Sequence, residues 1–187
     1  MTWNQVRWTE AHQIASLMDA GGPLPADGIA PDEHYRGVRG GGDRLTAVSF
    51  LGHALPRFEA LAWAARVLDE QAAARTLARA DAQALEHALR WLGEPDDANR
   101  RAAMAAAEGA GEDAPERMLA TGVFFSGGSI SEPDLPPVMP PPELAGRFAA
   151  IAVVMAAARV EERDAVLDRA LDLGERVATD GMAALAR

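Results

Sequence analysis

The sequence predicts an all-α protein, a compact bundle of about seven to nine helices with one long proline-rich surface loop. Three observations predict it: alanine dominates the apolar residues, apolar side chains recur at helical spacing, and helix-capping residues separate the segments. The chain has 187 residues, enough to bury a core without disulfides. We expect a single helical domain over residues 1–187, with residues 1–42 as a looser N-terminal extension.

The first part of the chain is predicted to contain one helix and one long loop. Residues 3–20 are expected to form the helix. Residues 21–42 are rich in glycine and proline and have no clear period, so they predict a loop with at most one helical turn near residues 32–36. Asp43 is a favourable N-cap, so a second helix is expected over residues 44–55.

The next helix is predicted over residues 56–71, because proline suits a first helical turn. At 100° per residue, most apolar side chains of this segment fall on one half of the helix. Trp63 instead falls at the edge of the polar stripe, one turn after Glu59. We therefore expect Trp63 near the surface, as a candidate partner contact. Another helix is predicted over residues 73–92.

Capping residues predict three further elements. Asp96 and Asp97 precede a helix over residues 99–109, and Pro115 begins one that ends near residue 125. Residues 129–142 contain six prolines and are expected to form an extended loop across the surface.

The last two helices are predicted over residues 142–160 and 162–186. The first is apolar almost all round, which is typical of a helix at the centre of a bundle. Four of its side chains are expected to be almost fully buried: Phe148, Ile151, Ala152 and Met155. The second is amphipathic, and Gly174 and Gly181 lie on its apolar side. Because glycine costs about 1 kcal/mol relative to alanine in a helix, we expect another helix to approach closely there.

Composition excludes several classes of function. The net charge is −10, and all 18 basic residues are arginines without a basic stripe, which argues against nucleic-acid binding. There is no cysteine for a disulfide, a thiolate metal site or a nucleophile. The longest apolar run, residues 148–158, is too short for a membrane span of about 20 residues. Residues 1–10 do not resemble a secretory signal, so we expect a cytoplasmic protein.

The sequence offers no catalytic constellation. None of the four histidines lies three or four residues from another, and no metal motif is present. The paired carboxylates lie at expected helix starts, where they act as caps. We therefore expect no catalytic residues, no metal and no cofactor, while a site assembled from distant segments remains open.

Ser126, Gly127, Gly128 and Ser129 form the most distinctive short motif. Glycines allow backbone amides to approach a phosphate, but this motif follows a helix, whose C-terminal dipole repels anions. A helix cap and tight turn is the first interpretation, and a ligand or partner contact is the second. Three apolar residues follow between the prolines. Leu135, Val138 and Met139 would either anchor a protein partner or pack on the bundle as a strap.

Three blocks of sequence resemble an uncharacterised bacterial domain family. The first is Phe50-Leu51-Gly52-His53-Ala54-Leu55-Pro56-Arg57 with Glu59-Ala60 and Ala62-Trp63-Ala64, the second is Trp91-Leu92 with Pro95 and Arg100-Arg101-Ala102-Ala103, and the third is Phe125-Ser126-Gly127-Gly128-Ser129 with Pro137-Val138 and Pro140-Pro141. The resemblance covers residues 40–187, with Ala62 at a position where the family pattern has an aromatic residue. It implies a link to gene clusters of type VI secretion systems and no established activity.

Together these observations favour a non-enzymatic accessory or adaptor protein that acts through protein–protein contacts. The candidate partner-binding residues are Trp63, Ser126, Gly127, Gly128, Ser129, Leu135, Val138 and Met139. The alternative is a small-molecule-binding or enzymatic domain with a site near the turn at residues 126–129. A structural subunit of a homo-oligomer is a third interpretation, which the sequence does not separate from the first.

Overall fold

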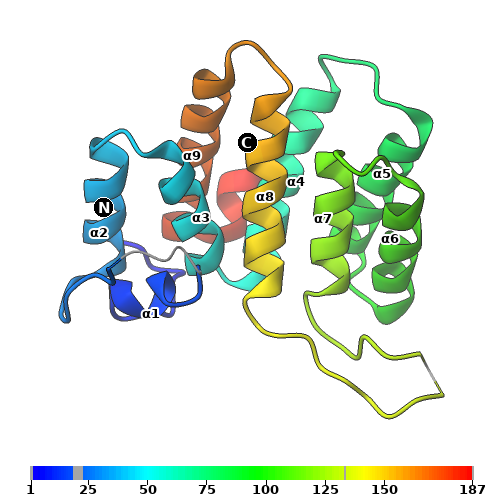
Figure 1. Cartoon of the computed structure of the whole chain (residues 1–187), viewed down its shortest axis with the longest axis horizontal. Coiled ribbons are helices and arrows are strands. Elements are labelled where there is room, and N and C mark those ends of the chain that lie inside the picture. Colours follow the sequence, from blue (N-terminus) through cyan, green and yellow to red (C-terminus); the bar gives the residue numbers. More distant parts are fainter. Residues whose placement is uncertain (1, 19–22, 133, 187) are drawn as a thin grey trace.

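Nine α-helices and one 3₁₀ helix follow one another in residues 2–18, 23–132 and 134–186, the part of the chain that this computed structural model describes (Figure 1). The helices are α1 (Ala11–Ala15), α2 (Pro31–Gly40), α3 (Arg44–Ala54), α4 (Arg57–Ala72), α5 (Arg79–Gly93), α6 (Asp97–Gly109), α7 (Pro115–Phe124), α8 (Leu144–Ala158), α9 (Arg163–Asp180) and the 3₁₀ helix η1 (Gly181–Leu185). These described residues contain no β-strand, which confirms the predicted all-α bundle.

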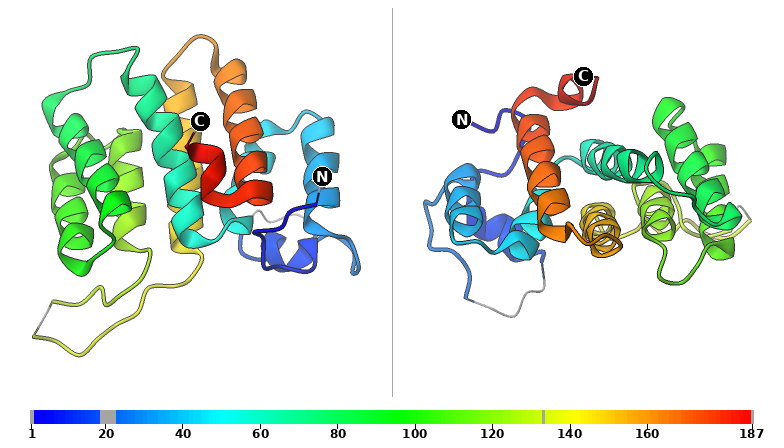
Figure 2. Two further views of the ribbon diagram at one scale, coloured as in Figure 1. Left: turned by 180° about the vertical axis from the view of Figure 1, so that it is seen from behind. Right: turned by 90° about the horizontal axis from the view of Figure 1, so that it is seen from above.

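Helix α8 lies at the centre of the bundle, as the sequence predicted. It packs against α3, α4, α7 and α9. Helices α5–α7 lie on one side of α4 and α8, and α1–α3 with α9 lie on the other (Figures 1 and 2). No helix among the described residues is both long enough and apolar enough to cross a membrane.

Small side chains let α8 accept four neighbours. Its buried residues are Ala145, Gly146, Ala149, Ala150, Ala152, Val153, Ala156 and Ala157. The closest approach is to α3, where a Cβ atom added to Gly52 would lie 2.7 Å from the carbonyl oxygen of Gly146. A Cβ atom added to Gly146 would in turn overlap the carbonyl oxygen of Gly52. The two backbones are therefore in direct contact, which only glycine permits.

The larger side chains of α8 are less buried than predicted. Ala152 is fully buried, but Ile151 is 38% exposed and Phe148 and Met155 are half-buried. Phe148 stacks on Phe125, with 5.6 Å between the ring centroids. The prediction failed for these three residues because the neighbouring helices approach the alanine and glycine positions, which leaves a stripe of α8 uncovered.

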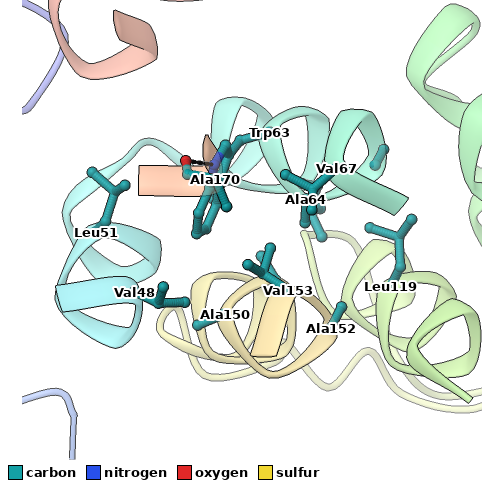
Figure 3. Packing of buried hydrophobic residues seen from close by; sticks show 14 of the residues in the cluster. Val48, Leu51, Trp63, Ala64, Val67, Leu119, Ala150, Ala152, Val153 and Ala170 are labelled. Carbon is teal, nitrogen blue, oxygen red and sulfur yellow. Dashed lines mark hydrogen bonds between the residues drawn. The ribbon is translucent and has the colours of Figure 1, made fainter. Parts of the chain in front are cut away.

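Trp63 is fully buried, so its predicted place at the surface is wrong (Figure 3). Its indole Nε1 donates a hydrogen bond of 2.8 Å to the carbonyl oxygen of Ala170 in α9. Helix α4 is covered by α8 and α9 over more than the half that its amphipathic pattern indicates. Trp63 consequently acts in the core and cannot contact a partner of the folded chain.

The predicted close contact at Gly174 is confirmed. A Cβ atom there would overlap Leu51 Cδ2 and lie 3.0 Å from Trp63 Nε1. Gly181 has a different role, because the α-helix ends at Asp180 and does not continue to residue 186. Gly181 takes a φ of +68°, a left-handed conformation that suits glycine, and it begins the 3₁₀ helix.

The predicted helix over residues 3–20 is mostly absent. Only Ala11–Ala15 are helical, and residues 19 and 20 lie outside the described residues. Trp3 is buried against Tyr35, with ring centroids 4.9 Å apart. The backbone amide of Gln5 donates to the carbonyl oxygen of Ala178. These tertiary contacts hold an extended segment along α9, and they outweigh the helical propensity.

Residues 31–40 form a complete helix, α2, where a loop was predicted. Pro31 occupies the first helical turn, and the fully buried Tyr35 donates to the carbonyl oxygen of Leu171 at 3.4 Å. Arg39 forms ion pairs with Asp172 and Glu175 of α9. The glycines hid this helix in the sequence, because packing on α3 and side-chain bonds to α9 offset their low propensity.

Local capping signals were more reliable than long helical patterns. Asp43 accepts from the Thr46 amide and Asp96 from the Asn99 amide, so both predicted N-caps are confirmed. The predicted helix over residues 73–92 begins only at Arg79, because the chain reverses direction between α4 and α5.

The contact between α3 and α8 yields a stability prediction. We expect Gly146→Ala to lower the free energy of unfolding by about 1–3 kcal/mol, because the added methyl group meets backbone atoms of Gly52. Gly37→Ala is the matched control, because nothing lies within 4 Å of the added Cβ on this helical, exposed glycine. It should raise stability by up to about 1 kcal/mol. Urea denaturation measures both, and equal effects would contradict the close contact.

Candidate functional site

The Ser-Gly-Gly-Ser turn (residues 126–129) ends α7, as its first interpretation predicted. The Ser126 hydroxyl donates to the carbonyl oxygen of Val123 at 2.7 Å. Gly128 has a φ of +71°, whereas an added Cβ on Gly127 would meet nothing within 4 Å. The turn is therefore a helix cap that redirects the chain into the loop at residues 129–142, called the 129–142 loop below.

Arg100 of α6 fixes this turn by hydrogen bonds to its backbone. Its guanidinium group donates to the carbonyl oxygens of Phe124 at 2.7 Å and Ser129 at 2.8 Å, and it lies over the Phe124 ring. It also pairs with Asp97 at the start of the same helix. The Arg100 side chain is only 4% exposed, so these bonds replace the water that a buried cation would otherwise need.

Two further arginines complete the support. Arg101 donates to the carbonyl oxygens of Ser129 at 3.1 Å and Ser131 at 2.9 Å. Arg57, in the first turn of α4, donates to the carbonyl oxygen of Ser126 at 3.2 Å. Three arginines from two helices thus bond carbonyl groups that no regular secondary structure satisfies.

Asp97 fixes the orientation of two of these arginines. Hydrogen bonds from Arg100 and Arg101 lower the pKa of its carboxyl group below the ordinary value. The carboxylate therefore stays charged throughout the neutral and mildly acidic range. Its support of the arginines is complete above its ordinary pKa and is lost only as the pH falls through the lowered pKa.

The base of the 129–142 loop is fixed by hydrogen bonds across it. The Ser129 hydroxyl oxygen accepts from the backbone amides of Ser131 and Val138, each at 3.1 Å. The Ile130 amide donates to the carbonyl oxygen of Val138 at 2.9 Å. Residues 129–131 and Val138 are consequently joined next to the arginines, and the described part of the loop projects from the end of the bundle (Figure 1).

The apolar side chains of this loop point into solvent. Leu135, Val138 and Met139 are 60%, 52% and 63% exposed. A strap would bury them on the bundle, so the strap interpretation is wrong for these three residues. Pro140 alone among residues 134–142 is buried and ties the returning chain to the body of the protein.

A cavity of about 680 Å³ lies beside the turn. Its walls come from the N-terminal segment, the junction of α3 and α4, and the start of α8. Leu17, Leu55 and Phe58 contribute apolar surface, and Trp8 donates its indole N–H to the carbonyl oxygen of His53 at 3.2 Å. The His53 ring in turn bonds the Ser49 carbonyl oxygen through Nδ1 at 2.8 Å.

Charged side chains also face this cavity. They are Arg7, Arg57, Glu59 and Glu143. Since Arg57 bonds Ser126, one side chain belongs both to the cavity wall and to the support of the turn. The cavity volume falls in the range of small-molecule sites, about 300–1,000 Å³.

The sequence pattern indicates the turn and the loop but not the arginines that donate hydrogen bonds to them. Arg57, Arg100 and Arg101 belong to the three blocks of sequence, yet no role followed from the sequence alone. The structure brings the blocks together, because Arg57 and the Arg100–Arg101 pair all bond carbonyl groups of residues 124–131. Trp63 does not join this site.

Comparison with known proteins places the chain in one family. A sequence model of the family of unknown function DUF6931 matches residues 35–178, which is most of the chain. The chain belongs to this family. No curated protein and no solved structure matches the sequence. The three arginines, the turn and the loop all lie within the part of the chain that defines the family.

Removal of the Arg100 guanidinium group should destabilise the protein. We expect Arg100→Met to cost about 2–4 kcal/mol, because it leaves the half-buried carbonyl group of Phe124 without its arginine donor and removes one of the two arginine donors to Ser129. The loop should also become more sensitive to a protease. Arg90→Met is the control, since the ion pair that Arg90 makes among the described residues is an exposed one with Glu86 in the same helix, and it should change stability by less than about 0.5 kcal/mol. Urea denaturation and limited proteolysis measure the two effects, and similar behaviour of both variants would contradict the structural role of Arg100.

Proposed function

We propose that this protein is a non-enzymatic adaptor that binds a protein partner through the 129–142 loop. The observation that carries the proposal is the exposure of Leu135, Val138 and Met139 on a loop whose base is fixed. Single exposed apolar residues are common on protein surfaces, but three of them on one projecting segment are typical of an interaction site.

The rigidity of the loop favours binding. Its prolines restrict the backbone. Arg100 and Arg101 donate to Ser129 and Ser131, and the Val138 amide donates to the Ser129 hydroxyl oxygen, so the base of the loop is fixed. A segment that has already lost conformational freedom loses less entropy when a partner binds it. The arginines therefore support recognition indirectly, by holding the loop in one conformation.

The charges of the loop define the kind of partner. Glu132 and Asp134 precede the apolar side chains and are exposed, and residues 129–142 contain no basic residue. We infer a partner protein with an apolar groove that is bordered by arginine or lysine side chains. Such a border attracts the acidic loop and orients it during the encounter.

The resemblance described above extends the proposal. It supports a bacterial protein that works in the cytoplasm beside the proteins of a type VI secretion system. The family itself has no known function, so this link stands on the resemblance alone. Identification of the bound partner decides it, because a partner unrelated to that secretion system would refute the link and leave the docking role intact.

A triple serine variant tests the docking role. Leu135→Ser, Val138→Ser and Met139→Ser together should leave the melting temperature nearly unchanged, because all three side chains are exposed. The variant should lose the partner that co-purifies with the wild type from its native cell, as identified by mass spectrometry.

Leu45→Ser with Leu89→Ser is the control, because these residues are 44% and 37% exposed on helices outside the loop. This pair should retain the partner. The docking role is refuted if the triple variant keeps every wild-type partner, or if it unfolds well below the wild type.

A second function is favoured by the cavity beside the turn. Its apolar walls and its two arginines suit a small molecule that carries a carboxylate or phosphate group next to an apolar part. This is the small-molecule alternative, with the site displaced from the glycines of the turn to the junction of α3 and α4. Glu59 and Glu143 would restrict the site to ligands that also present a hydrogen-bond donor.

A thermal-shift screen of small organic acids and phosphates tests this second function. A true ligand should raise the melting temperature of the wild type and lose that effect in Arg7→Gln, because this variant removes a cation from the cavity wall. Arg75→Gln, which changes an exposed arginine outside the cavity lining, should behave like the wild type. Ligands that stabilise all three proteins equally would show that the cavity is not the binding site.

A further inference from the structure

Three side chains with metal-binding groups meet near the N-terminus, away from the 129–142 loop. They are Glu10, His12 and Asp27, whose nearest ligand atoms all lie within 4.8 Å of one another. His12 Nδ1 is 3.3 Å from Glu10 Oε2 and 3.6 Å from Asp27 Oδ1. Among the residues that the structure describes, this is the one such group of three or more.

The His12 nitrogen has an unusual environment for a surface histidine. The Nδ1 atom is shielded from solvent, and no atom of the described chain makes a hydrogen bond of acceptable geometry with it. The two carboxylate oxygens nevertheless lie next to it. Three potential ligand atoms thus converge at one place, where a bound cation could be coordinated by all of them.

The distances match those between ligands of a small metal ion. Bonds of about 2.0–2.1 Å in tetrahedral geometry place neighbouring ligand atoms roughly 3.3 Å apart. The His12–Glu10 distance has this value, and the His12–Asp27 distance is slightly longer. Asp27 is almost entirely exposed, so a small rotation of its side chain closes the remaining gap.

We propose that Glu10, His12 and Asp27 bind a divalent transition-metal ion of the zinc type. One imidazole nitrogen and two carboxylate oxygens are ligands that zinc accepts, and water would complete the coordination. An imidazole ligand disfavours magnesium and calcium, which prefer oxygen ligands only.

The surrounding backbone positions these ligands. The Gly28 amide donates to Glu10 Oε2 at 2.9 Å, which fixes the orientation of that carboxylate. The Ala11 amide donates to the carbonyl oxygen of Ile29 at 2.8 Å and joins the start of α1 to the segment that carries Asp27. Ala11 and Ile14 are fully buried, so α1 itself is anchored to the core.

The metal would link two segments of the chain, residues 10–12 and residue 27. Residues 10–12 and residue 27 are brought together by the bond between Ala11 and Ile29 and by the bond from Gly28. A metal bound by both segments would stabilise the folded state, because the unfolded chain does not hold the ligands together. The site lies outside residues 35–178, the part of the chain that the family model matches.

Zinc titration of the full chain tests the proposal. We expect the wild type to compete with a chromophoric chelator for one zinc ion per chain, and zinc to raise its melting temperature. His12→Asn and Asp27→Asn should each weaken zinc binding at least about tenfold, because even an outer partner of a metal ligand contributes about that much. Asp27→Asn changes an exposed side chain and should not unfold the protein, so a loss of zinc binding in this variant reports on the site itself.

His87→Asn is the matched control. The Nδ1 atom of His87 is also shielded and without a hydrogen bond in the described chain, but it belongs to no such group of ligands. This variant should bind zinc like the wild type, and magnesium should not replace zinc in any of the proteins. Absence of zinc binding by the wild type, or equal binding by His12→Asn, Asp27→Asn and the wild type, would overturn the proposal and leave His12 as a histidine paired with two carboxylates.

Discussion

The backbone contact between Gly52 and Gly146 determines where the other parts of this bundle lie. It lets the backbones of α3 and α8 come into contact where they cross, with no side chain between Gly52 and Gly146. The crossing brings the end of α3 to the start of α8. The junction of α3 and α4 and the end of the 129–142 loop therefore lie side by side and line one cavity. The candidate functional surface depends on this crossing.

Arginine side chains supply the hydrogen-bond donors that the loop at that surface needs. The residues that the structure describes between α7 and α8 form no regular secondary structure, so their carbonyl groups need other donors. Arg57, Arg100 and Arg101 supply them, and a guanidinium group can serve several acceptors at once because its donors form a planar fork. Asp97 orients two of the three. The loop is thereby held at its base while its apolar side chains face solvent.

The predictions that succeeded concern local features. Asp43 and Asp96 cap helices because a carboxylate next to free backbone amides is stabilising in any context, and Gly128 turns the chain after α7 because it adopts a left-handed conformation without strain. The predictions that failed concern burial and long-range contacts. Trp63 lies beside the polar stripe of α4, but α9 supplies an acceptor for its indole N–H and covers it. Residues 31–40 are helical because Tyr35 and Arg39 find partners on α9.

The sequence by itself determined the all-α class, the central position of α8 and the turn and loop after α7, because alanine content, an apolar surface on all sides, and glycine and proline act locally. Tertiary structure alone decided which faces of α4 and α8 are covered, because the neighbouring helices approach α8 most closely where its side chains are smallest. It also decided which side chains meet. Arg57 and Ser126 are 69 residues apart in the sequence, and Glu10 and Asp27 belong to different segments, so no spacing or period reveals their contacts. Long-range juxtaposition depends on the packing of whole helices, and that packing gives this protein its candidate sites.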